Sequence, residues 1–117
     1  MTDQPSSDTQ RIRALNDQVR SAGPTQSAQA RWLITAGVRA LGDAATTAAV
    51  QAVRRFETFD ANNDPHGEHD FGAFTIVGEQ LFWKIDYYDH DLSAGSPDAA
   101  DETLTCRVVT LLLASEY

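Results

Sequence analysis

The sequence predicts a single α+β domain with two layers, in which N-terminal helices pack on a small, mainly antiparallel sheet. Three observations favour this class: helical spacing of apolar residues early in the chain, a hairpin pattern over residues 70–88, and an apolar segment near the C-terminus. A length of 117 residues fits one domain. We expect residues 1–8 to form a disordered tail and residues 9–117 to form the domain, because the start of the chain is polar.

The first half of the chain predicts a helix, a short strand and a second helix. One face of the first helix carries apolar residues at three- and four-residue spacing, namely Ile12, Leu15 and Val19. Either Asp8 or Thr9 suits its start, and Gly23 suits its end. Residues 31–35 are apolar and partly β-branched, which favours a strand. Asp43 is expected to cap the second helix. The buried side of that helix is expected to carry Ala45, Ala49, Ala52, Val53 and Phe56.

A β-hairpin is the best-defined element of the sequence. Residues 71–77 and 80–88 flank Gly78-Glu79, which suits a type II′ turn with glycine in the first position. The more apolar face of the hairpin is expected to face the core, and it carries Asp70, Phe74, Ile76, Leu81, Trp83, Ile85 and Tyr87. Because side chains alternate along a strand, the register of this turn places one polar group on the opposite face. The group comprises His69, which pairs with Tyr88, together with Lys84 and Asp86.

The last third of the chain predicts a loop followed by one more element. Residues 89–101 contain Gly95, Ser96 and Pro97 and are expected to form the loop. Residues 103–114 fit either a helix or a buried strand, because three consecutive leucines suit both. The valines and threonines of this segment favour the strand.

Charge is distributed very unevenly along the chain, whose net charge is −8. The segment from Glu57 to Glu102 carries twelve carboxylates and one cation, Lys84, whereas the preceding residues carry seven arginines and four acids. This acidity argues against direct binding of nucleic acid, because phosphates and carboxylates repel each other. No apolar run reaches the ~18 residues of a membrane-spanning helix, and one cysteine suits a reducing cytosol. We therefore expect a cytoplasmic protein without a membrane partner.

Five segments carry a recognisable pattern: residues 11–17 (RIRALND), 63–72 (NDPHGEHDFG), 82–89 (FWKIDYYD), 96–98 (SPD) and 116–117 (EY). Together they resemble a family of short bacterial proteins of unknown function, which are often encoded on plasmids and prophages. The resemblance covers nearly the whole chain and implies no activity. What it implies is a setting among the accessory genes of mobile elements, which include small acidic inhibitors of host defence.

The charge pattern and this setting predict a small acidic interaction protein that binds a basic surface of a nucleic-acid-handling protein. Its most concrete form is an anti-defence inhibitor of the anti-CRISPR or antirestriction type, acting by nucleic-acid mimicry or by steric block. The expected contacts are Asp60, Asp64, Asp86, Asp89, Asp91, Asp98, Asp101 and Glu102. A plain solvated acidic surface explains the same residues, and the sequence leaves the oligomeric state open.

The alternative is an enzyme that uses the loop from His66 to Asp70. Acid/base chemistry would use His69, Lys84, Asp86 and Tyr88. A metal would be held by His66, Glu68, His69 and Asp70, although their spacing is not that of a zinc signature. A structural interpretation, in which His69 orders the loop through hydrogen bonds to carboxylates, explains the same residues. We therefore expect neither a cofactor nor a resident metal.

Overall fold

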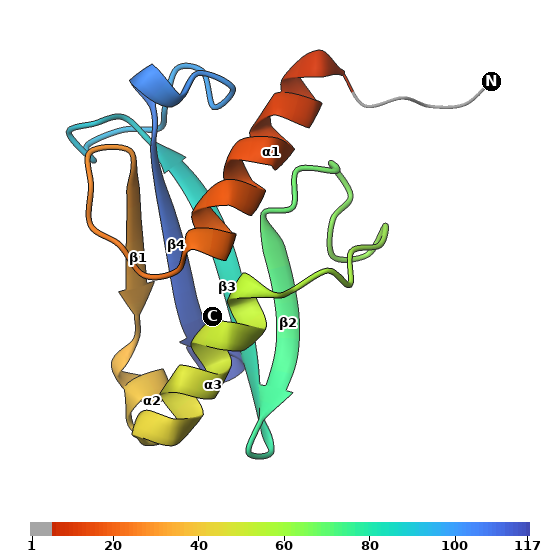
Figure 1. Ribbon diagram of the computed structural model, residues 1–117, viewed down its shortest axis with the longest axis vertical. Helices are drawn as coiled ribbons and strands as arrows, with labels where there is room; N and C mark the ends of the chain where they lie inside the picture. The colour runs from red at the N-terminus through yellow and green to blue at the C-terminus, as the bar shows by residue number, and fades with distance from the viewer. Residues whose placement is uncertain (1–5) are drawn as a thin grey trace.

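The structure is a computed structural model that describes residues 6–117 of the chain. Helices and a four-stranded sheet form two layers (Figure 1), so the α+β class predicted from the sequence is confirmed. The α-helices are α1 (Ser7–Ala22), α2 (Ala36–Arg39) and α3 (Asp43–Arg54). The strands are β1 (Ala30–Ile34), β2 (Phe71–Ile76), β3 (Glu79–Tyr88) and β4 (Cys106–Leu113). Two short 3-10 turns, at Glu102–Leu104 and Ala114–Glu116, flank β4.

The N-terminal half differs from the predicted pattern at its helix boundaries. Helix α1 begins at Ser7, because the Ser6 hydroxyl accepts a hydrogen bond from the backbone N–H of Thr9 at 3.0 Å. Three residues of the expected tail, Ser6 to Asp8, therefore belong to the start of the helix; its other residues, 1–5, lie outside the described residues. Helix α3 begins at Asp43 as predicted, but its N-cap is Gly42. The short helix α2 was not expected.

The strand order is β1-β4-β3-β2. Strand β4 pairs parallel with β1 and antiparallel with β3, so the C-terminal segment is a strand in the interior of the sheet, as its valines and threonines predict. Strands β2 and β3 form the predicted hairpin. The sheet is therefore mixed and mainly antiparallel.

The hairpin turn lies one residue earlier than predicted. Ile76 pairs with Glu79, and Val77 and Gly78 form the two-residue turn with φ values of 46° and 82°. Two positive φ values are the pattern of a type I′ turn, not type II′. The predicted register was therefore wrong by two residues. Because this shift is even, every strand side chain stays on the predicted face.

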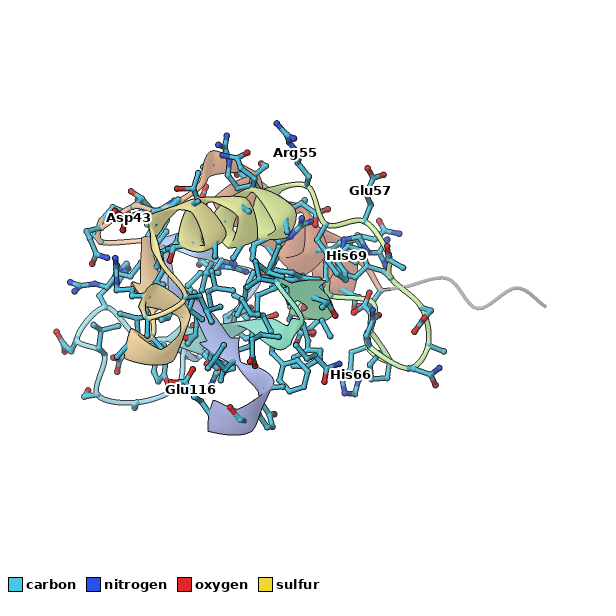
Figure 2. All side chains as sticks on the ribbon, turned by 90° about the horizontal axis from the view of Figure 1, so that it is seen from below. Asp43, Arg55, Glu57, His66, His69 and Glu116 are labelled. Atoms are coloured by element: carbon cyan, nitrogen blue, oxygen red, sulfur yellow. The ribbon has the colours of Figure 1, made fainter. Side chains whose placement is uncertain are left out.

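Helices α1 and α3 cover one face of the sheet, here called the covered face (Figures 1 and 2). The hydrophobic core lies between them and the sheet. From the sheet it takes Leu81, Trp83, Ile85, Val109 and Leu111, and from the helices Val38, Ala49 and Val53. The predicted core face of the hairpin is thereby confirmed. The opposite face, here called the free face, carries Leu33, Lys84, Asp86 and Tyr88.

Candidate functional site

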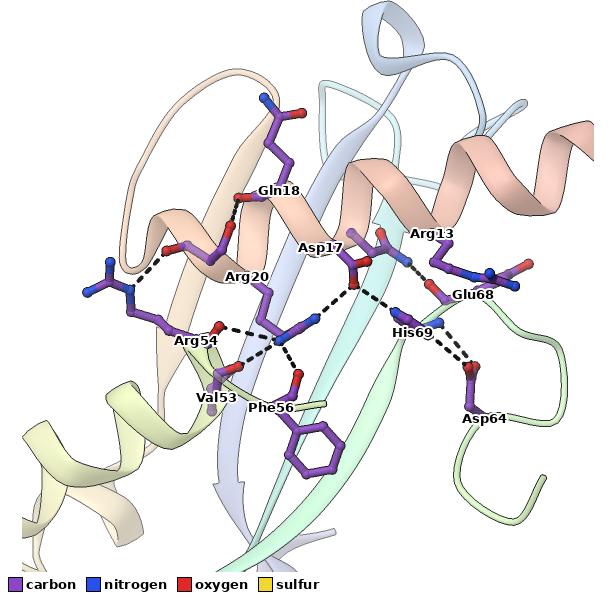
Figure 3. Close-up of polar contacts among 12 residues, drawn as sticks. Arg13, Asp17, Gln18, Arg20, Val53, Arg54, Phe56, Asp64, Glu68 and His69 are labelled. Atoms are coloured by element: carbon purple, nitrogen blue, oxygen red, sulfur yellow. Dashed lines mark hydrogen bonds and ion pairs between the residues drawn. The ribbon is translucent and has the colours of Figure 1, made fainter. Parts of the chain in front are cut away.

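Two of the sequence segments that carry the family pattern meet on the covered face. Arg13 of α1 donates from Nε to the carbonyl oxygen of Gly67 at 2.6 Å. Asn16, one turn later, donates from Nδ2 to the carbonyl oxygen of Glu68 at 3.0 Å. Figure 3 shows α1 lying beside this loop. The helix therefore holds the loop through backbone carbonyls of the loop.

His69 is the centre of this contact. Its ring Nδ1 lies 2.8 Å from Oδ1 of Asp17, and its backbone N–H donates to Oδ1 of Asp64 at 3.0 Å (Figure 3). The ring also stacks on Phe59 with 3.7 Å between centroids. A φ of 56° turns His69 towards the helices. The hydrogen bonds to carboxylates that the structural interpretation expects of His69 are present, and the predicted pairing of His69 with Tyr88 was wrong, since β2 begins only at Phe71.

A buried guanidinium ties α1 to the end of α3. Arg20 donates to the carbonyl oxygens of Val53 at 3.1 Å and Phe56 at 2.8 Å, and to Oδ1 of Asp17 at 2.8 Å (Figure 3). Carbonyls at the end of a helix have no intrahelical partner, so the cation satisfies groups that would otherwise be buried without a hydrogen bond. Asp17 thus joins Arg20 to His69.

A second buried network extends the first into the sheet. The fully buried Asn16 side chain donates to the Tyr87 hydroxyl and accepts from Nε of Arg107, both at 2.8 Å. Tyr87 in turn donates to Oε1 of Glu68 at 2.8 Å. Burial raises the pKa of Tyr87 and lowers the pKa of Arg107. The network is enclosed and hydrogen-bonded throughout, which is typical of a structural role.

The residues of the metal alternative do not converge. His66 is exposed and lies apart from His69 (Figure 2). Burial, followed by the neighbouring Glu68 carboxylate, raises the pKa of Asp70. Within residues 6–117, no three His, Cys, Asp or Glu side chains are arranged to hold a metal ion. The set His66, Glu68, His69 and Asp70 is therefore not assembled as a ligand shell.

The residues of the acid/base alternative are separated by the sheet. Lys84 Nζ lies 2.9 Å from Oδ2 of Asp86, which confirms that these two residues pair, and this hydrogen bond raises the pKa of Lys84. Tyr88 lines the same free face. His69 packs on the covered face, so the structure does not bring it to the other three residues.

The loop that joins β3 to β4 carries five of the eight expected contact residues. This acidic loop, residues 89–102, contains Asp89, Asp91, Asp98, Asp101 and Glu102. Several of these carboxylates accept hydrogen bonds from nearby backbone N–H groups: Asp89 from Ser93, Asp98 from Ala100, and Asp101 from Thr103. The hydrogen bonds from Thr103 lower the pKa of Asp101. The turns therefore hold these carboxylates in place.

The other three expected contacts lie elsewhere. Asp60 accepts hydrogen bonds from the N–H groups of its own turn, and the Asp64 side chain is only 6% exposed. Their loop lies across α1 from the acidic loop (Figure 1). Asp86 lies on the free face. The eight acids therefore form one loop cluster and separate outliers, not one continuous surface.

His90 fixes the acidic loop to the chain before β1. Its Nδ1 lies 2.9 Å from the carbonyl oxygen of Ala28, and its Nε2 lies 2.6 Å from that of Thr103. A carbonyl can only accept, so both hydrogen bonds form together when the ring is protonated and both nitrogens donate. These two hydrogen bonds raise the pKa of His90. Sequence reasoning missed this contact, because no local pattern links His90 to Ala28.

A groove on the free face was also missed. It is lined by Arg31 and Leu33 of β1, Val108 and Thr110 of β4, Lys84, Asp86 and Tyr88 of β3, and Leu92 of the acidic loop. Its volume is about 430 Å³. The only sequence signal was the alternation of each strand, and the groove exists because β1, β4 and β3 are neighbours.

Within residues 6–117, none of the helices is both long and apolar enough to span a bilayer. No curated protein and no solved structure matches the chain. A protein family described as "Protein of unknown function (DUF3768)" matches residues 34–116, which is more than half of the sequence. The matched region contains β2, β3 and β4, the last residue of β1 and the acidic loop. The chain is therefore a member of the DUF3768 family, whose function is unknown.

Proposed function

We propose that this protein is a small acidic interaction protein that occupies a basic surface of a nucleic-acid-handling protein. The acidic loop carries the proposal. Among the described residues, the single lysine or arginine within ion-pairing distance of this loop is Arg11, whose Nη2 lies 3.4 Å from Oε1 of Glu102. The other four carboxylates of the loop have no such cation to neutralise them, and the chain as a whole has a net charge of −8.

Turn geometry supports this role of the loop. Asp89, Asp98 and Asp101 use hydrogen bonds from the backbone to stay in position, so the negative field of the loop is fixed before a partner arrives. A fixed field of one sign accelerates association with a basic surface and rejects acidic ones. Such association weakens as salt screens the charges over a Debye length of about 10 Å at 0.1 M.

In its most concrete form, the proposal is an inhibitor of a bacterial defence system that acts in the cytoplasm. The inhibitor would block a nucleic-acid site by mimicry or by steric occlusion, as anti-CRISPR and antirestriction proteins do. The support for this form is the charge pattern together with the resemblance to proteins of mobile elements. The acid/base alternative has less support, because His69 lies on the covered face and Lys84, Asp86 and Tyr88 lie on the free face. The metal-dependent alternative has less support, because its four residues do not converge.

Competition between the protein and DNA tests the proposal. The tagged protein is used at low salt to capture basic proteins from a bacterial lysate, and each captured protein is then purified and assayed for duplex DNA binding. We expect at least one partner whose DNA binding this protein blocks, with an inhibition constant that rises steeply with salt.

A matched pair of double variants serves as the control. Asp91→Asn with Asp98→Asn removes two charges from the acidic loop, and Glu57→Gln with Glu79→Gln removes two exposed charges elsewhere. The first variant should inhibit at least about threefold more weakly than the second. Equal inhibition by both variants, or partners that bind DNA and this protein simultaneously, would contradict the proposal.

A further inference from the structure

The register of the sheet explains why the free face is grooved. One row across the strands reads Arg31, Val108 and Asp86, and the next row reads Leu33, Thr110 and Lys84. In both rows the middle strand, β4, supplies the short side chain and its neighbours supply longer ones. The walls lie about 10 Å apart, because neighbouring strands are about 4.8 Å apart. The groove is therefore one strand wide.

The apolar side chains that line the groove are exposed to solvent. Leu33 is 53% exposed, and Leu92 is 38% exposed. Leu92 has a φ of 59°, a left-handed conformation that is uncommon for a bulky side chain. This leucine lines the groove although it belongs to the acidic loop. The groove and the loop therefore form one continuous surface.

The charge around the groove indicates what fits it. Asp86 stands on the β3 wall, and Asp89 and Asp91 belong to the same turn as Leu92. Lys84 pairs with Asp86 on the β3 wall, and Arg31 stands on the opposite wall, so the negative charge near the groove lies at the end formed by Asp89 and Asp91. A second copy of the chain is disfavoured, because each copy carries a net charge of −8.

We propose that the groove along β4 binds an extended segment of a basic partner, whose alternate apolar side chains lie between Leu33 and Leu92. Cations of the segment then face Asp89 and Asp91 of the acidic loop. The inference rests on the proposed function, since it identifies the apolar anchor of the same partner. An extended segment suits a groove one strand wide, because every second side chain points the same way.

A peptide pair separates the apolar contribution from the charge. The probe is a fluorescein-labelled peptide in which leucines alternate with lysines, and its control carries serine in place of each leucine. Fluorescence anisotropy measures both dissociation constants at low and moderate salt. We expect the leucine peptide to bind at least about tenfold more tightly, the minimum expected for burying one leucine side chain.

Two variants of the groove and one matched control locate the binding site. Leu33→Ser and Leu92→Asn each remove one apolar wall, and asparagine tolerates the left-handed backbone of Leu92. Val77→Asn removes an exposed apolar side chain at the distant hairpin turn. The preference for the leucine peptide should fall to below about threefold in the two groove variants and remain in the control. In NMR spectra, the backbone amide chemical shifts of Leu33 and Thr110 should change when the leucine peptide is added.

The outcomes distinguish this inference from the proposed function. If both peptides bind equally and with strong salt dependence, the proposed function of the acidic loop is supported, but the inference about the groove is wrong. If neither peptide binds at low salt, the proposed function and the inference about the groove are both wrong. A concentration-dependent dimer that Leu33→Ser disrupts would assign the groove to a second copy and would also overturn the inference.

Discussion

Both faces of the sheet carry polar and aromatic side chains. The polar groups are buried on the covered face and partly exposed to solvent on the free face. On the covered face, Asn16 and Arg107 are buried and bonded to each other, and Arg20 is bonded to carbonyls of α3. On the free face, Lys84 and Asp86 pair in partial contact with solvent, and Leu33 is exposed. The polar side chains of the covered face therefore stabilise the fold. The less conspicuous free face is the one that a partner can reach.

A matched pair of leucines tests this difference most directly. Leu81→Ala removes a fully buried side chain from the covered face and should lower the free energy of unfolding by about 3 to 4 kcal/mol. Leu33→Ala on the free face should change it by no more than about 0.5 kcal/mol. Urea unfolding of both variants measures the two values. Similar losses would show that the free face is part of the core.

The buried arginine of α1 should have the next largest effect. Arg20→Ala leaves the carbonyls of Val53 and Phe56 without their donor, so we expect a loss of about 2 to 3 kcal/mol in the free energy of unfolding. Arg55→Ala, which removes an exposed arginine at the C-cap of α3, is the control and should cost less than about 0.5 kcal/mol. Equal urea midpoints for the two variants would refute the structural role of Arg20.

Replacement of the loop histidine should loosen the loop and leave binding intact. His69→Ala removes the stacking on Phe59 and the contact with Asp17, and we expect a loss of about 1 to 2 kcal/mol. Hydrogen exchange should become faster across residues 64–70. The inhibition constant measured against the DNA-binding partner should stay at the wild-type value. A folded His69→Ala protein that no longer inhibits would instead assign a functional role to the covered face.

The smallest effect should be a pH dependence from His90. Its pKa in the folded protein lies above the model value of 6.5. The stabilisation that protonated His90 contributes is therefore complete below pH 6.5, and it is lost as the pH rises through the pKa of His90 in the folded protein. Between about pH 6 and about pH 8, the urea midpoint of the wild type should fall more than that of His90→Gln. The variant His66→Gln removes an exposed imidazole elsewhere and should keep the wild-type slope. If the urea midpoints of all three proteins change equally with pH, the hydrogen bonds of His90 do not hold the acidic loop in place.

The hairpin shows which features of the structure local sequence patterns predict and which they do not. Alternation correctly assigned Leu81, Trp83 and Ile85 to the core, because a strand has only two faces. The register was wrong by two residues, because Gly78 suits either position of a two-residue turn. His69 was misplaced for a different reason. Its left-handed backbone depends on contacts with Asp17 and Phe59, which lie far from it in the sequence or in another element.

Composition and spacing were enough to establish the fold class, the strands and helices apart from α2, the core face of the hairpin and the concentration of acids after residue 57. These features depend on residues close together in the chain. The groove, the His90 contact and the division of the polar residues between two faces depend on β1 lying beside β4 and on α1 lying beside the loop at 64–70. Such pairings form between distant segments, and their free energy depends on packing that no local pattern records.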